Sequence, residues 1–417
     1  MSALPRTRIV ITGMGVRTAI GSTVPEFEAA LREGRSGVSW IAAGDRRLPA
    51  AMLPELSWTS APPDARRGLR GAPPATQIGC AVAYEAMAAA RLTSAPGWTE
   101  SAIVVAGNNI HQRYAQEHYE IFRKRPQYLS PRYAVSFLDT NVVSALSEIA
   151  GLRGPGFTVG GSMASGNAAL YQAFHLLQSG AVETCVAIGA LADYGDFEFQ
   201  AFSNLGALSC ATPEDSPAGP GAPFDRRRSG FVYGQGSGCV ILETAEHARR
   251  RGVTALAELA GVSMLLDGHA ASDPSPEGEA MAMRKALSHA GVEPRQVDYL
   301  NAHGTSTAAG DEAECEAIEK VFEGLPGPLI NSTKELTGHT IYAAGIVECI
   351  ATVVQMEGGF LHPNPNLTDP IAPRLRFVGP VARQERPQVC LSNAFSVGGI
   401  NSSVVLRRCS EDPGEGF

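Results

Sequence analysis

The chain has 417 residues, of which 44% are apolar and 18% are charged, and it contains 45 glycines and 28 prolines. A chain of this length can bury a large core and form one to three domains, and its composition is typical of a compact, turn-rich, enzyme-like protein. The formal net charge of −8 argues against a general nucleic-acid-binding surface. Four short basic clusters could receive an acidic partner, although such clusters are usually only solvated faces. They are Arg66-Arg67, Arg123-Lys124-Arg125, Arg226-Arg227-Arg228 and Arg249-Arg250-Arg251.

The eight cysteines are scattered, with no Cys-x-x-Cys pair and no His/Cys ligand spacing. This argues against a zinc site and against a disulfide scaffold, so we expect no metal and a reducing, cytoplasmic location. Residues 1–7 lead directly into a predicted strand, without the pattern of a signal peptide. We also expect no apolar run long enough to span a bilayer, and hence no membrane partner.

Predicted strands and helices alternate through the first half of the chain. A first strand at 8–12 is followed by an expected turn at 13–16, a helix at 24–35 and an irregular segment at 36–74 that is rich in Pro, Gly and Arg. Further helices are expected at 75–90, 141–149 and through 170–177, and further strands at 101–106, 156–160, 184–189 and 238–242.

The second half repeats this pattern after a composition shift at 248–252. Strands are expected at 255–264, 297–301, 388–392 and 402–407, and helices at 278–290, 311–322 and 344–355. Strands that alternate with helices indicate an α/β protein with right-handed crossovers and mostly parallel sheets. We therefore predict a duplicated α/β unit, with halves at 1–250 and 251–417.

Residues 112–141, called here the helical arm, interleave charged and aromatic side chains, including Tyr119, Phe122 and Tyr128. The segment is expected to be a helical excursion that either covers a site or forms a dimer contact.

The stretch from Thr158 to Asn167 predicts a strand end, a tight turn of small residues and the start of an apolar helix. Such an elbow directs one side chain into a cleft, and its small residues let backbone N–H groups approach a ligand. The expected apex residue is Met163, which is neither a nucleophile nor a base. The neighbouring Ser162 is a weak candidate for a substitute nucleophile, because its side chain should point away from the cleft.

Two histidines occupy loops where α/β folds place ligands. His303 follows a buried strand in a run of Gly, Ser and Thr, although such a histidine is structural about as often as functional. Lys334 and His339 flank a tight turn before a small-residue helix. A nearby ammonium disfavours imidazolium and would keep His339 a neutral N–H donor, but Lys334 and Glu348 could equally be a plain ion pair.

Three further segments could line the same site. The loop from Asn393 to Asn401 is rich in glycine and could offer N–H groups to an oxyanion, or could be a simple turn. The segments Pro223-Phe224-Asp225 and Gly230-Phe231-Val232 could place an aromatic ring over the site, although a buried Phe is usually only core.

In this order along the chain, these motifs resemble the β-ketoacyl-acyl carrier protein synthases of the thiolase superfamily, over essentially the whole length. The family pattern is an elbow Cys-x-Ser-Gly, then Pro-Phe-Asp, His-Gly-Thr-x-Thr, Lys-x-x-x-Gly-His and a terminal Gly-Phe-Gly-Gly-Thr-Asn. The matching segments here are 163–166, 223–225, 303–307, 334–339 and 396–401.

The resemblance implies a thiolase-type five-layer αβαβα fold, a dimer (a homodimer is expected) and an acyl carrier protein as substrate. It implies no cofactor of the chain's own beyond the 4'-phosphopantetheine of the carrier. The implied catalytic residues are His303, His339, Phe231 and Lys334, with the two histidines on the thioester carbonyl and Phe231 against the malonyl carboxylate. The implied pantetheine-binding residues are Thr305, Thr307, Phe395, Val397 and Gly398, with Glu348 and Asp311 as supporting residues.

The departures from the family pattern predict the type of reaction. Met163 replaces the nucleophilic Cys, and a thioether is a poor acyl acceptor. Val397 replaces a gating Phe, and Tyr342 replaces a small residue. Decarboxylation of a malonyl thioester needs donors at the carbonyl oxygen and not the thiol, so the chain is similar to the decarboxylating ketosynthases of polyketide β-branching cassettes, which usually carry Ser at this position. We therefore expect a malonyl-acyl carrier protein decarboxylase that produces the acetyl form.

Other classes remain open. A non-catalytic chain-length-factor-like partner also lacks the Cys, although its usual signature is loss of the histidine pair. A structural or carrier-binding paralogue would bind without turnover. A third, weaker alternative is an acyltransferase or condensing enzyme that uses Ser162 or no nucleophile.

Overall fold

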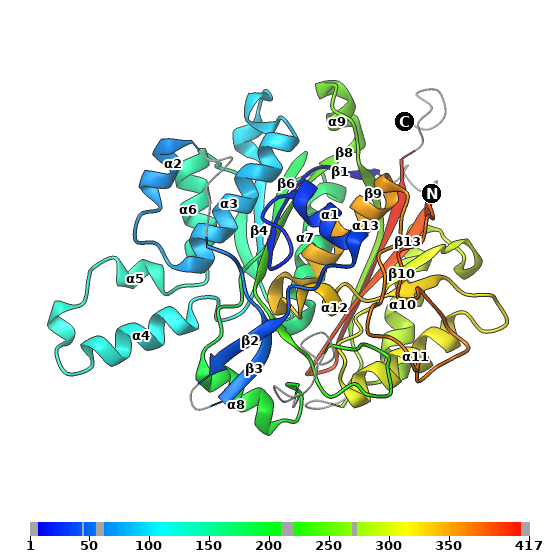
Figure 1. Cartoon of the computed structure of the whole chain (residues 1–417). Helices are drawn as coiled ribbons and strands as arrows, with labels where there is room; N and C mark the ends of the chain where they lie inside the picture. The colour runs from blue at the N-terminus through cyan, green and yellow to red at the C-terminus, as the bar shows by residue number, and fades with distance from the viewer. Residues whose placement is uncertain (1–6, 44–45, 56–61, 210–220, 269–272, 410–417) are drawn as a thin grey trace.

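Ten strands of the computed structural model form two five-stranded units that repeat each other (Figure 1). The structure describes residues 7–43, 46–55, 62–209, 221–268 and 273–409. The first unit contains β1 (Ile9–Thr18), β4 (Ala102–Ala106), β5 (Gly156–Val159), β6 (Thr184–Gly189) and β8 (Gly236–Thr244). The second contains β9 (Ala257–Leu266), β10 (Tyr299–Asn301), β11 (Leu329–Asn331), β13 (Val389–Ser396) and β14 (Ile400–Arg408).

The two units have the same strand order when each is followed from the edge of the sheet to its centre. The order across the sheet runs β11-β10-β13-β14-β9 and then β1-β8-β6-β4-β5, with the short β12 (Arg376–Phe377) added beside β11. The two units join at β1 and β9 through only two residue pairs, Val10 with Glu258 and Ile11 with Ala257. This palindromic order is the duplication that the sequence predicts. The predicted boundary at 250/251 falls at the end of α9 (Ala245–Arg251).

Helices cover the strands in three layers. The helices α7 (Ser165–Gln178) and α13 (Ala344–Gly358) pack against each other and against strands of both units. On the first unit, α3 (Pro74–Ala89) contacts β1 and β8, and α6 (Asn141–Ala150) contacts α3 and β4. On the second, α10 (Pro276–Ala290) contacts β9 and β14, and α11 (Ala308–Val321) contacts α10. The result is the expected five-layer αβαβα arrangement. The prediction of mostly parallel sheets is wrong, because the strands at the centre, β1, β8, β9 and β14, pair antiparallel with their neighbours and only the outer strands pair in parallel.

The turn predicted at 13–16 is wrong, because these residues continue β1 as far as Thr18. The glycines there serve packing: a Cβ on Gly13 would lie 2.3 Å from the carbonyl oxygen of Ala86 in α3. The second unit repeats this contact, since a Cβ on Gly261 in β9 would lie 2.5 Å from the carbonyl oxygen of Ala286 in α10. Each glycine therefore lets an outer helix approach a strand closely.

The segment predicted to be irregular at 36–74 is also partly wrong. It contains β2 (Ser39–Ala43), β3 (Arg46–Ala51) and α2 (Pro63–Gly68), and β2 and β3 form a small sheet with β7 (Tyr233–Gly234). Strand β3 pairs in parallel with β7, about 180 residues away. Local sequence patterns cannot reveal a pairing over such a distance. The other helices are α1 (Val24–Glu33), α4 (Gln112–Phe122), α5 (Tyr133–Ser136), α8 (Asp196–Asn204) and α12 (Lys334–Thr337).

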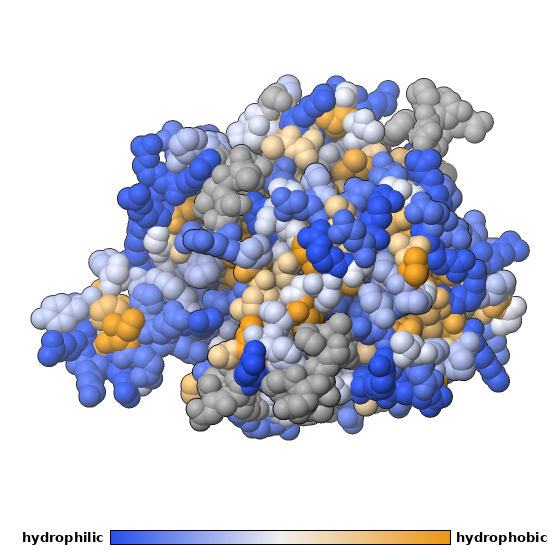
Figure 2. Space-filling view, viewed as in Figure 1, coloured by the Kyte–Doolittle hydropathy of each residue, from blue (hydrophilic) through white to orange (hydrophobic). Residues whose placement is uncertain are grey.

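The helical arm is helical, as predicted, and projects from the body of the molecule as α4 and α5 (Figure 1). An apolar patch on it is visible in Figure 2, and Tyr119, Ile121 and Tyr128 are each more than 60% exposed. The dimer contact expected of the arm stays a prediction.

The central helix α13 corrects one expectation. The 18-residue helical stretch Ile341–Gly358 is long and apolar enough to cross a membrane, contrary to the prediction that no such run exists. However, 89% of it is buried inside the fold between the two units. Its apolar character follows from its position in the middle layer, since a helix that is apolar all round is a core helix or a membrane span.

Candidate active site

The elbow lies between β5 and α7, as predicted, and a 3-10 turn (Ser162–Ala164) links them. The backbone strain falls on Ser162, whose φ is +50°, and not on the expected apex Met163. Side chains hold this turn: Ser165 Oγ accepts from Gly161 N at 3.0 Å, and Asn108 Oδ1 accepts from Ser162 N at 3.1 Å. Met163 is only 7% exposed, and its side chain faces the interior.

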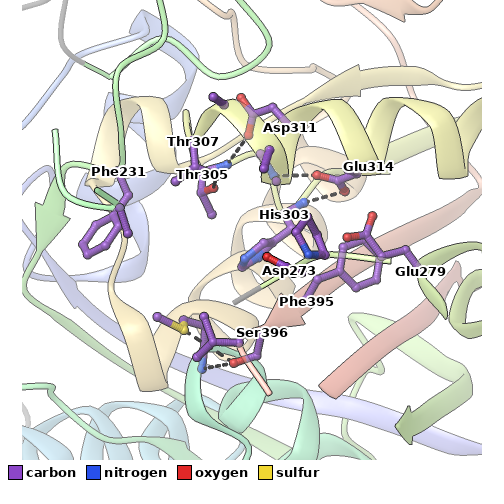
Figure 3. Close-up of a pocket in the computed structure, with 18 of the residues that line it drawn as sticks. Phe231, Asp273, Glu279, His303, Thr305, Thr307, Asp311, Glu314, Phe395 and Ser396 are labelled. Atoms are coloured by element: carbon purple, nitrogen blue, oxygen red, sulfur yellow. Dashed lines mark hydrogen bonds between the residues drawn. The ribbon is translucent and has the colours of Figure 1, made fainter. Parts of the chain in front are cut away.

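Two serine hydroxyls hold the Met163 side chain. Ser162 Oγ donates to the thioether sulfur at 3.3 Å and Ser396 Oγ at 3.4 Å. Ser396 Oγ also accepts from Met163 N at 3.0 Å (Figure 3). Met163 belongs to a buried apolar cluster that also contains Phe199, Phe231 and Tyr342.

Two buried carboxylates hold the His303 loop. Glu314 accepts from the backbone N–H groups of His303 (2.8 Å) and Gly304 (2.7 Å). Asp311 accepts from Thr305 N at 2.9 Å and Ser306 N at 3.1 Å. Burial raises the pKa of Asp311 to about 7 and also raises the pKa of Glu314, while the backbone N–H donors favour the carboxylate forms. Both acids lie on one face at the start of α11, directly after the loop that they hold.

His339 is fixed as a neutral imidazole with its proton on Nε2. Its backbone N–H donates to Val232 O at 2.7 Å, and its Nδ1 accepts from Ile341 N at 3.1 Å. Because Nδ1 is an acceptor, the proton must be on Nε2 in the neutral ring. Nε2 is buried and has no hydrogen-bond partner among the described residues. The ring therefore holds a free N–H donor.

The two imidazoles form a pair whose ring centroids are 5.4 Å apart. Burial and the Lys334 ammonium lower the pKa of both rings well below the ordinary value, and His339 lowers that of His303 further. Nδ1 of His303 is also buried without a partner among the residues that the structure describes. Phe231 lies edge-on to His339, with centroids 5.7 Å apart. The imidazole pair is thus neutral near pH 7 and beside an apolar wall.

Lys334 and Glu348 are both almost fully buried and form an ion pair at 2.5 Å. Burial raises the pKa of Glu348 to about 7 although Lys334 opposes this. The sequence predicts that they support the His303 loop. In the structure the carboxylates that accept from the loop's backbone N–H groups are Asp311 and Glu314, and Lys334 acts on the imidazoles through its charge.

The elbow, the imidazole pair and Phe231 surround one cavity of about 330 Å³ (Figure 3). This volume is within the usual range for ligand sites. Lys334, Glu348 and Gly398 are not among its lining residues, and no lining residue comes from the helical arm. Ser162 is also absent from the lining, in agreement with its expected direction. The predicted residues that line the cavity are Met163, Phe231, His303, Thr305, Thr307, Asp311, His339, Phe395 and Val397.

The cavity residues to which the sequence analysis assigned no individual role include Glu314, Glu279 and Ser396. Glu314 could have been found from its position three residues after Asp311 on the helix that follows the His303 loop. Glu279 in α10 is 2% exposed, and its Oε2 has no partner among the described residues. Burial and the charges of Glu314, Asp267 and Asp311 raise its pKa well above the ordinary value. Nothing local in the sequence marks Glu279, and although Ser396 lies in the glycine-rich loop that was expected to line the site, nothing local marks its contact with Met163.

Two family models match the chain in sequence. The N-terminal domain of β-ketoacyl synthases matches residues 6–248, and the C-terminal domain matches residues 256–368. The chain belongs to the β-ketoacyl synthase family.

Relatives of this chain align along nearly its whole length. It is 36% identical over 413 residues to the polyketide biosynthesis malonyl-ACP decarboxylase PksF of Bacillus subtilis (strain 168), with 98% of each chain covered. It is 32% identical over 419 residues to the 3-oxoacyl-(acyl-carrier-protein) synthase 2 of Vibrio harveyi, covering 98% of this chain and 100% of the relative. A β-ketoacyl synthase from Burkholderia phymatum has a similar crystal structure, with a TM-score of 0.86 at 29% identity, covering 97% of this chain and 100% of that one. The predicted family and thiolase-type fold are confirmed.

Proposed function

We propose that this synthase decarboxylates malonyl thioesters on an acyl carrier protein and releases the acetyl form. The observation that carries the proposal is the imidazole pair: two neutral rings, of which His339 is buried and His303 half-buried, face one cavity whose elbow residue is Met163. Each ring has a buried nitrogen without a partner among the described residues. A buried donor without a partner costs about 1–3 kcal/mol, so its retention favours a ligand atom as the missing acceptor. The name of the Bacillus subtilis relative agrees with this reaction.

The geometry supports a mechanism in which the imidazoles bind the thioester carbonyl oxygen. His339 Nε2–H and an N–H of His303 donate to that oxygen, and Phe231 places an apolar ring where the carboxylate leaves. The bond between the carboxylate and the α-carbon breaks, its electron pair forms the enolate, and carbon dioxide departs. One such donor contributes about 2.7–4 kcal/mol to stabilising a developing oxyanion.

The elbow decides the fate of the enolate. Met163 has no displaceable proton, so no acyl group waits on the enzyme to be attacked. The surrounding apolar cluster, which includes Phe199 and Tyr342, offers no nucleophile in its place. The enolate then takes a proton from solvent at its α-carbon, and the product is the acetyl thioester.

The substrate arrives on the 4'-phosphopantetheine arm of an acyl carrier protein. The names of both relatives refer to such a carrier protein. Thr305 and Thr307 are suited to the arm, because their hydroxyls lie 2.9 Å apart on the cavity wall and can exchange hydrogen bonds with its amides. We further propose a homodimer formed through the helical arm, and a role in supplying acetyl-carrier protein for polyketide β-branching.

The decisive experiment is to incubate the protein with malonyl-loaded carrier protein and to weigh the carrier. Loss of carbon dioxide supports the proposal. An unchanged mass with a folded protein would contradict it and favour a non-catalytic, chain-length-factor-like or carrier-binding role. A His175→Ala variant, altered at an exposed histidine outside the cavity, controls for the loss of an imidazole elsewhere.

A further inference from the structure

We infer that Ser396 is a second block on acyl loading, because its hydroxyl occupies the position that an oxyanion would take at the elbow. The inference rests on the proposed function only in assuming that acyl loading is the half-reaction that this site has lost. It adds a specificity-determining residue to a site that Met163 alone was expected to close.

The N–H groups of the elbow turn show where this position is. Gly161 N, Ser162 N and Ala164 N donate to acceptors close to the turn, namely Ser165 Oγ, Asn108 Oδ1 and Gly161 O. Met163 N differs, because its acceptor is the hydroxyl of a residue 233 positions away that lines the cavity. Met163 N–H is therefore the elbow donor that points to the cavity, and its acceptor in the structure is the hydroxyl of Ser396.

The sheet fixes the position of Ser396. It is the last residue of β13 and pairs with Ile400 of β14, so its hydroxyl is presented by a regular strand. The 3.0 Å bond from Met163 N and the 3.4 Å contact with the thioether sulfur place Oγ directly against the apex residue. A ligand oxygen could reach the N–H only by displacing this hydroxyl. A glycine here would leave the position open.

Acyl loading would need this donor. A thiolate at position 163 would attack the carbonyl carbon of an acyl-carrier thioester, forming a new C–S bond and a tetrahedral oxyanion. The bond to the carrier sulfur then breaks, and the carrier leaves as a thiol that takes the proton first lost by the introduced thiol. Removing one oxyanion donor typically slows such a step by about 10²–10³. Placing a cysteine at the elbow should therefore not be enough to permit loading.

The test compares Met163→Cys with Met163→Cys/Ser396→Gly. Each is incubated with acetyl-loaded carrier protein, and the acyl group on the peptide that contains position 163 is measured by mass. We expect the double variant to load about 10²–10³ times faster than the single variant. Alkylation of the introduced thiol by iodoacetamide shows that it is accessible in both.

The matched control is Met163→Cys/Ser162→Gly, since Ser162 also contacts the thioether but accepts no bond from Met163 N. Glycine also suits its positive φ. This variant should load as slowly as Met163→Cys. Equal rates for Met163→Cys and Met163→Cys/Ser396→Gly, whether both are fast or both undetectable, would overturn the inference. The proposed function fails separately, when the unmodified protein leaves malonyl-carrier protein unchanged.

Discussion

The elbow and the imidazole pair face the same cavity but treat their polar groups in opposite ways. At the elbow, all four N–H groups of residues 161–164 have acceptors within the chain. In the imidazole pair, Nδ1 of His303 and Nε2 of His339 are buried without a partner in the part of the chain that the structure describes. Because buried polar groups are nearly always paired, the unpaired set marks where a ligand belongs. The polar groups of the elbow are satisfied within the fold, whereas the unpaired nitrogens of the imidazole pair remain available to a substrate.

The supports of the two regions differ as well. Neutral hydroxyl and amide groups of Ser165, Asn108 and Ser396 close the elbow. Around the imidazole pair the supports are charged or titratable: Asp311 and Glu314 hold the His303 loop, and burial together with the Lys334 ammonium lowers the pKa of both rings. A condensing synthase would need both regions open to substrate. Here only the imidazole side keeps free donors, which is consistent with one half-reaction retained and the other lost.

The largest expected effect comes from the imidazole pair. His339→Ala or His303→Ala should each lower the decarboxylation rate by about 10²–10³, and the double variant should show no measurable activity. The reason is the loss of N–H donors to the thioester oxygen. The measurement is carbon dioxide release from malonyl-carrier protein, with His175→Ala as control. A single variant that retains full activity would remove that imidazole from the mechanism.

The next effect concerns the buried ion pair. Lys334→Met leaves Glu348 as an unpaired buried acid, and breaking such a pair costs about 3–5 kcal/mol of unfolding free energy. The Lys334→Met/Glu348→Leu variant removes both charges and should recover much of this stability in a denaturant titration. Both variants also lose the cation that lowers the imidazole pKa values, so the rate should fall off at a higher pH on the acid side. An unchanged pH profile would show that Lys334 has no electrostatic role.

At the elbow the expected change is mainly in stability. Met163→Ala removes a side chain held by two hydroxyls in an aromatic cluster, and should cost about 2 kcal/mol, at the low end for such truncations because the site borders an open cavity. Decarboxylation should fall by less than about tenfold, since no donor to the carbonyl oxygen is lost. Loss of activity in a folded Met163→Ala protein would give Met163 a catalytic role and would break the contrast between the two regions.

The residues that sequence analysis identified share one property: each lies in a short segment whose pattern is local in the chain, such as a strand–loop–helix or the β13–β14 hairpin. The elbow, the His303 loop and the His339 turn could all be predicted in this way, as could the helices that carry their own spacing, such as α1 and α7. The contacts that it missed are long-range. Gly13 serves a helix more than 70 residues away, and Ser396 meets Met163 across 233 residues. Glu279 reaches the cavity only because α10 packs beside α11.

The smallest expected effect tests the imidazole side through Glu279. Its carboxyl is buried, with no partner for Oε2 among the described residues, and burial raises its pKa well above the unfolded value of about 4.3. Between these two pKa values the unfolded chain loses the proton and the folded chain keeps it, so folding stability falls as the pH rises. Glu279→Gln removes this proton linkage. The apparent Tm of the variant should exceed that of the unmodified protein by on the order of 2–4 °C at pH 8, and by less at pH 5.

Glu277→Gln is the matched control, because Glu277 lies on the same helix but is largely exposed and paired with Lys320. Its substitution should change the apparent Tm little, and equally at both pH values. A Glu279→Gln difference that did not grow with pH would mean that the buried carboxyl is as easily ionised in the folded chain as in the unfolded one. The Glu279 carboxylate would then be hydrogen-bonded or ion-paired in the folded chain. The polar groups on the imidazole side of the cavity would in that case be satisfied within the fold, like those of the elbow.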